Sequence, residues 1–176
     1  MELKDLQEQS VFSIGKENTA YAQYFDGMSY LAMISLKQVI IGNVTFEPGC
    51  RNHWHIHHAS KGGGQMLLVT AGRGYYQEWG KPAQELRPGD VVHILPEVKH
   101  WHGAASDSAF QHLAVEVPGE NTANEWCEAV TKEEKKENLE GKQRNSKNRT
   151  ALDTQKEETM DWNTAFAVLR KFYEEK

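Results

Sequence analysis

From Val39 onward the chain consists of short apolar segments, and each segment is closed by a glycine or a proline. The segments are VIIGNVTFEPG, QMLLVTAG, GYYQEW, VVHILP and FQHLAVEVPG, with QELRPGD as a turn. They are rich in β-branched and aromatic residues, and no helical pattern separates them, which is typical of consecutive strands. The pattern predicts an all-β fold over residues 39–130, with a jelly-roll barrel as the natural arrangement.

The regions on either side of these segments have other compositions. Residues 1–38 are mixed, with aromatic side chains around a turn at Asp26 and Gly27, and we assign them to an N-terminal arm and the first strands. Residues 131–159 are highly charged and carry almost no bulky apolar residue, so they cannot bury a core. This composition predicts a charged linker after the barrel.

The last segment, residues 160–176, regains apolar residues at helical spacing. Trp162, Phe166 and Leu169 recur three or four positions apart, and Asp161 precedes them as a candidate N-cap. The segment is therefore predicted to form a short C-terminal amphipathic helix. This helix either packs on the barrel or on a neighbouring subunit, or binds a partner.

Charge and cysteine usage narrow the functional classes. The 176 residues carry a net charge of −5, with both signs interspersed, so a nucleic-acid-binding face is not expected. No run approaches the roughly 20 apolar residues of a membrane span, and the start of the chain lacks the apolar core of a signal peptide. We expect a cytoplasmic protein without membrane contact, in which Cys50 and Cys127 are free thiols.

Histidines are concentrated in the predicted barrel, since all eight fall between positions 53 and 112. Side chains alternate along a strand, so His55 and His57 share one face, and His100 and His102 repeat this spacing. Such pairs can hold a metal ion, transfer protons or serve as hydrogen-bonded core residues. Two pairs in one domain favour the metal site.

The last histidine lies alone in the predicted strand FQHLAVEV. Alternation places His112 on the same face as Ala114 and Glu116. The near-neutral pKa of an imidazole suits a general acid or base. A histidine buried among residues such as Leu113 and Val115 is also typical of a packed core, so both roles stay open.

The spacing around the first histidine pair resembles the first motif of the cupin family. Gly49 is followed by five residues and then by His55 and His57. Gln65 stands where the motif has glutamate, and Gly72 follows six residues later. The loop before Gln65 departs from the motif, because it holds seven residues instead of three or four.

The resemblance extends to the second cupin motif through RPGD and His100. The segments GQMLLVTAGRGYYQ and ELRPGDVVHILPEVKHWHGAASDSAFQHLAVE further resemble small bacterial cupins related to carboxymuconolactone decarboxylase. That group includes manganese-dependent hydroxynitrile lyases, in which glutamine also replaces the acidic ligand. The likeness covers about residues 39–127 and implies a cupin jelly-roll barrel with a short C-terminal helical appendage.

The resemblance also implies a site. It implies that a divalent ion is held by His55, His57, Gln65 and His100. Mn²⁺ is the first candidate, with Fe²⁺, Zn²⁺ or Ni²⁺ as alternatives, because neutral nitrogen and oxygen ligands do not select among these ions. A ligand set without a protein anion would leave the ion more Lewis-acidic. His112 corresponds to the histidine that moves a proton in the related lyases, and His102 is expected to line the pocket beside it.

Three functions are compatible with such a site. The leading one is a Lewis-acid lyase that acts on a small molecule such as a hydroxynitrile. The second is an Fe²⁺-dependent dioxygenase, and the third is a non-catalytic cupin that binds metal or a small molecule. A homodimer or higher homo-oligomer is expected.

The glycine-rich insert at residues 58–64 has two interpretations. It is either a detour that lets the strand re-enter or a mobile gate over the pocket. If the insert held Gln65 away from the histidines, the site would have three histidine ligands only.

Overall fold

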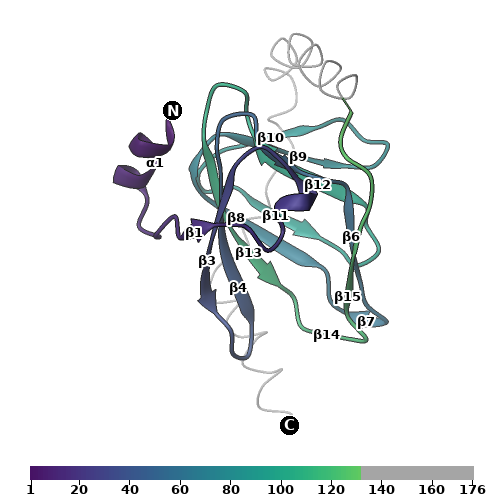
Figure 1. The fold of residues 1–176 in the computed structure, drawn as a ribbon. Coiled ribbons are helices and arrows are strands. Elements are labelled where there is room, and N and C mark those ends of the chain that lie inside the picture. Colours follow the sequence, from purple (N-terminus) through teal and green to yellow (C-terminus); the bar gives the residue numbers. More distant parts are fainter. Residues whose placement is uncertain (132–176) are drawn as a thin grey trace, which may run out of the picture. The chain divides into compact units, whose positions relative to one another are not determined.

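The computed structural model describes residues 1–131, and these form antiparallel sheets packed face to face (Figure 1). The first sheet has, in hydrogen-bonded order, β1 (Lys16–Glu17), β3 (Ser29–Ser35), β4 (Ile40–Phe46), β13 (Phe110–Glu116), β8 (Gln65–Gly72) and β11 (Val91–Ile94). The all-β jelly-roll prediction is confirmed. The predicted linker, apart from Thr131, and the predicted C-terminal helix lie outside the described residues.

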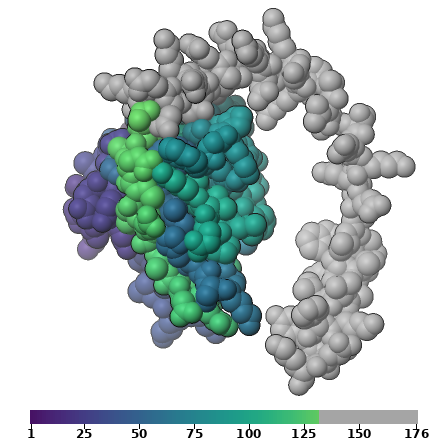
Figure 2. All heavy atoms as spheres, turned by 90° about the vertical axis from the view of Figure 1, so that its right-hand side faces the viewer, coloured from purple at the N-terminus to yellow at the C-terminus, as the bar shows by residue number. Residues whose placement is uncertain are grey.

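The second sheet carries most of the histidines. Its strands are β10 (Gln84–Leu86), β9 (Gly74–Glu78), β12 (His100–Ala104), β5 (Arg51–Asn52) and β2 (Phe25–Asp26), with β6 (His55–His58) paired to β12 and to β15 (Ala123–Trp126). A separate two-stranded sheet joins β7 (Lys61–Gly62) to β14 (Gly119–Glu120). Figure 2 shows the last described segment, in green, at the surface of the barrel beside the blue residues that include β6.

The core lies between the two large sheets, because both supply its buried side chains. Leu67 and Val69 of β8 alternate with the more exposed Met66 and Leu68, as expected for a strand that covers one side of a core. Phe46 and Phe110, also from the first sheet, are fully buried and lie 6.1 Å apart between ring centroids. The second sheet contributes these core residues: Tyr76, Leu86 and Ala104.

One helix, α1 (Leu3–Gln9), was not expected from the sequence. Its first turn is capped by Asp5, whose carboxylate accepts the N–H of Glu2 at 3.2 Å. Leu6 is fully buried and packs with Ala71 and Ala109 in a small apolar cluster outside the main core. The helix therefore depends on contacts with the barrel. Within residues 1–131 no helix has the length and apolar character needed to cross a membrane.

Candidate metal centre and proton-transfer pair

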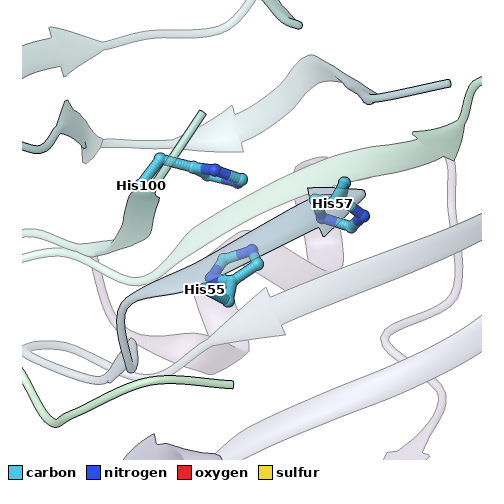
Figure 3. A group of neighbouring side chains, drawn as sticks. All are labelled: His55, His57 and His100. Atoms are coloured by element: carbon cyan, nitrogen blue, oxygen red, sulfur yellow. The ribbon is translucent and has the colours of Figure 1, made fainter. Parts of the chain in front are cut away.

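Three histidines predicted as metal ligands come together inside the barrel (Figure 3). His55 and His57 lie on β6, and His55 is the cross-strand partner of His100 on β12. One nitrogen from each ring lies within 4.8 Å of one nitrogen from each of the others, and all three residues are buried. Two nitrogens bound to one ion at about 2.1 Å are separated by at most about 4.2 Å. The nitrogen–nitrogen separations observed here are close to those of a metal centre.

Backbone carbonyls set the orientation of two of these rings. Nδ1 of His55 lies 3.0 Å from the carbonyl oxygen of His53, and Nδ1 of His100 lies 2.9 Å from that of Val98. A carbonyl can only accept, so both Nδ1 atoms carry the proton and both Nε2 atoms keep a free lone pair. Metal-binding histidines commonly have such an acceptor behind the ring.

Gln65 opens β8 and faces the interior, with 6% of its surface exposed. Its Oε1 is buried without a hydrogen bond, as are both ring nitrogens of His57 and Nε2 of His100. A buried polar atom left without a partner costs about 1–3 kcal/mol, so several in one place indicate that a bound group completes them. These side chains fit a divalent cation, because each one offers a lone pair and none offers a charge.

Backbone hydrogen bonds hold the glycine-rich insert in place. Gly63 donates its N–H to the carbonyl of Pro118 at 3.1 Å, and Val117 donates to the carbonyl of Gly64 at 3.1 Å. Gly64 has φ of +88°, and a Cβ at this position would lie 2.3 Å from the carbonyl oxygen of Ile94. The contacts support the detour interpretation, in which the insert returns the chain to the barrel at Gln65.

Both histidines predicted as catalytic are buried next to each other. Nε2 of His112 lies 3.0 Å from Nδ1 of His102. The pairing of β13 with β8 shifts register between Gln111 and His112, a β-bulge immediately before this side chain. Ring centroids of His102 and His55 are 5.4 Å apart, so the pair adjoins the candidate metal centre.

Asn52, which the sequence did not single out, sets the proton positions in this pair. Its Oδ1 accepts the backbone N–H of His102 at 2.9 Å, which leaves its Nδ2 as a donor whose closer contact is Nε2 of His102 at 3.0 Å. Nδ1 of His102 then carries the proton and donates to Nε2 of His112. The signal in the sequence is weak, since Asn52 precedes the histidine cluster without a fixed spacing to His102.

Burial keeps these imidazoles neutral. It lowers the pKa of His55 and of His102 well below the ordinary value, and the nearby His100 and His112, respectively, reinforce the effect. Burial likewise lowers the pKa of His100 to about 4 and that of His112 to about 4. Near neutral pH the rings therefore retain lone pairs for binding a cation or accepting a proton.

A carboxylate, Glu116, lies beside the predicted ligands and was given no role by the sequence. Its Oε1 accepts a hydrogen bond from Nε2 of Gln65 at 2.9 Å, and its Oε2 lies 3.2 Å from Nδ1 of His57. Burial opposes ionisation, but the contacts with His57 and Gln65 outweigh it and lower the pKa of Glu116. The available signal was strand alternation, which places Glu116 on the same face as His112.

A cavity of about 220 Å³ opens onto this side of the site. Its lining includes Ile40, His57, His58, Glu116 and Asn124. Its size suits a small molecule. A larger cavity of about 450 Å³ lies beside α1 and has none of the predicted site residues in its lining.

An aromatic stack packs against the ring of His55. Trp126 is the cross-strand partner of His55 on β15, and the two ring centroids lie 4.8 Å apart. Tyr24 stacks on the other side of Trp126 at 4.5 Å with an interplanar angle of 2°. The stack restricts the rotation of His55 and excludes water from that side of its ring.

The remaining histidines take no part in the candidate centre. His53 lies 3.6 Å from the carboxylate of Asp26, and His93 is exposed on β11. His58 faces away from the barrel interior, where its ring contacts Glu97 at 2.6 Å and Glu125 at 2.8 Å. All three rings thus lie outside the candidate ligand group.

Comparison with known proteins gives a consistent picture. The cupin domain family matches residues 42–116. An (R)-mandelonitrile lyase from Granulicella tundricola is 48% identical over 92 residues, which are 52% of this chain and 67% of that protein. The crystal structure of a cupin-like protein from Thermotoga maritima superposes with a TM-score of 0.64 at 38% identity, and covers 74% of this chain and 98% of that one.

Proposed function

The chain belongs to the cupin family, and on this basis we propose that it is a metal-dependent lyase that cleaves a small molecule of the hydroxynitrile class. One observation carries the proposal: three buried histidines with free nitrogens adjoin a second buried pair, His102 and His112, that can transfer a proton. The identity to a mandelonitrile lyase supports the substrate class. The wider likeness to cupins related to carboxymuconolactone decarboxylase stays a prediction.

The residues that would hold the ion are His55, His57, Gln65 and His100. We propose Mn²⁺ as the ion, because the donors are neutral nitrogen and oxygen atoms and the sequence resembles manganese-dependent hydroxynitrile lyases; Fe²⁺, Zn²⁺ and Ni²⁺ suit the same donors. When bound, the ion would supply a Lewis acid that polarises an oxygen- or nitrogen-bearing group of the substrate.

The protein's own task in the reaction is proton transfer. Cleavage of a hydroxynitrile removes the hydroxyl proton, forms the carbonyl double bond and expels cyanide with the electron pair of the broken carbon–carbon bond. His112 is neutral and buried, and its Nε2 carries the basic lone pair of the ring, so it can accept the hydroxyl proton when the substrate hydroxyl replaces the hydrogen bond from Nδ1 of His102. The same proton can then be returned to the leaving cyanide, which balances the reaction.

The cavity beside His57 is the proposed entrance for the substrate. Its volume of about 220 Å³ accepts a molecule of roughly the size of mandelonitrile. Ile40 offers an apolar surface, and Asn124 offers an amide to a polar substituent. The aromatic stack of Tyr24 and Trp126 packs against His55.

The test is release of benzaldehyde from mandelonitrile by Mn²⁺-loaded protein, corrected for spontaneous decomposition in buffer. His112→Ala should lower the rate by about 10²–10⁴-fold, the usual contribution of a positioned general acid or base. His93→Ala is the matched control, because His93 is an exposed histidine on β11. This variant should retain full activity. Equal rates for the parent protein and His112→Ala would contradict the proposed mechanism. Tight metal binding without turnover would favour a non-catalytic cupin instead.

A further inference from the structure

Glu116 occupies a position that the proposed reaction does not use. It ends β13, and its cross-strand partner on β8 is Gln65, so both side chains extend from the same face of the first sheet. Its side chain is 36% exposed and also borders the small cavity. An ionised carboxylate at this depth needs partners, and the structure provides two of them.

The first partner is the amide of Gln65. A carboxylate oxygen can only accept, so the contact of 2.9 Å between Nε2 of Gln65 and Oε1 of Glu116 fixes which end of the amide is nitrogen. The remaining amide atom, Oε1, is the one that is buried without a hydrogen bond. Glu116 thus holds Gln65 with its oxygen free to bind a cation.

The second partner is the imidazole of His57. Nδ1 of His57 lies 3.2 Å from Oε2 of Glu116, which is an ion-pair distance, and both nitrogens of the ring are buried without a hydrogen bond. Nδ1 of His55 and Nδ1 of His100 instead face a backbone carbonyl, which carries no net charge. His57 is therefore the ring of the three that lies against a carboxylate.

We infer that Glu116 is a positioning residue that orients Gln65 and supplies, from behind Gln65 and beside His57, the negative charge that the neutral ligand set lacks. The inference rests on the proposed metal site. A carboxylate behind an imidazole or an amide makes the donor atom in front more electron-rich, so it strengthens the bond to a cation without itself binding it. The atoms that bind the ion would then all be neutral, and the negative charge would lie behind them on Glu116.

The test is the affinity for Mn²⁺, measured by titration calorimetry on the full chain. Glu116→Gln keeps the shape of the side chain but removes its charge and allows the two amides to pair in either direction. Loss of such an outer partner typically weakens metal binding about 10–100-fold, and we expect this range. Glu125→Gln is the matched control, because Glu125 also contacts a histidine of β6 but on the outer face, and it should bind Mn²⁺ like the parent protein.

A second variant separates charge from packing. In the double variant Gln65→Glu, Glu116→Gln the carboxylate and the amide exchange strands, so the hydrogen bond is kept and the negative charge moves to the ligand position. We expect Mn²⁺ affinity to return at least to that of the parent protein. The Mn²⁺ electron paramagnetic resonance spectrum should change in both variants, which loss of packing far from the ion would not cause.

The outcomes distinguish the two proposals. If Glu116→Gln binds Mn²⁺ as tightly as the parent protein, or if the double variant stays as weak as Glu116→Gln, the inference about Glu116 is wrong whatever the activity. If the parent protein binds Mn²⁺ and Glu116 matters as expected, but mandelonitrile is not cleaved, the lyase proposal fails and the inference stands. Failure of the parent protein to bind any divalent ion would overturn both.

Discussion

His57 and His58 are neighbours on β6 and both contact carboxylates, yet they belong to two different environments. His57 faces the interior beside two other histidines, whereas the side chain of His58 is 33% exposed on the outer face. The two side chains point to opposite faces because successive side chains alternate along a strand. The inner cluster is defined here as His55, His57, His100 and Glu116, and the outer cluster as His58, Glu97 and Glu125.

The two clusters differ in which protonation state the protein favours. Hydrogen bonds from the His58 ring to Glu125 and Glu97 raise the pKa of His58, because both carboxylates favour the imidazolium. Burial acts in the opposite direction on His55 and His100, whose pKa values are lowered. Only neutral imidazole can bind a metal ion, so the comparison teaches that burial, and not the number of histidines, distinguishes a metal site from a surface ion pair.

The largest effect is expected when a ligand of the inner cluster is removed. His55→Ala and His100→Ala each delete one free Nε2, and we expect Mn²⁺ affinity to fall by at least the roughly 100-fold that loss of an outer partner can cost. His58→Ala deletes a ring that faces the other way, so its affinity should equal that of the parent protein. Equilibrium dialysis followed by elemental analysis measures both. A comparable loss in His58→Ala would mean that the outer cluster takes part in binding.

A smaller effect concerns the pH dependence of stability in metal-free protein. The pKa of His112 is about 4 in the fold and lies near 6.5 in the unfolded chain. Between these values the unfolded chain binds the proton and the folded chain does not, so stability falls as the pH is lowered. One such group contributes a slope of up to about 1.4 kcal/mol per pH unit.

The substitution His112→Gln tests this slope. The variant removes a buried group and will be less stable at every pH, but its stability should decline less steeply between pH 6.5 and 4 than that of the parent protein. Urea unfolding at a series of pH values, with chelator present, gives the two slopes. Equal slopes would show that His112 takes up no proton on unfolding.

Much of this architecture could be predicted from the sequence. The run QMLLVTAG became β8, and FQHLAVEV became β13 with one residue less. Alternation within a strand is a local property, so the shared faces of His55 and His57 and of His100 and His102 could be predicted without knowing the fold. The pairing of His55 with His100 required the family resemblance, because their strands are far apart in the chain.

Contacts that depend on strand register could not be predicted. The roles of Asn52 and Glu116 arise from pairing with strands that lie about fifty residues away, and no local pattern records that register. The helix α1 was missed for a related reason, since its apolar content is two leucines, the buried Leu6 and the partly buried Leu3, that pack on the barrel. The insert at residues 58–64 was recognised as a departure, but its pairing with β14 was not foreseen.

The smallest expected effect concerns the outer cluster, and it tests whether the two carboxylates there set the pKa of His58. Glu125→Gln removes the carboxylate with the largest influence on His58, so the pKa of His58 should move down toward its ordinary value. A raised pKa stabilises the fold at pH values below the ordinary one, and this contribution is lost as the pH rises through the folded value. Nuclear magnetic resonance titration of the imidazole protons measures the shift directly. Because both partners are solvent-exposed, we expect unchanged Mn²⁺ affinity and little change in unfolding, whereas a large loss of stability would show that the outer cluster supports the fold.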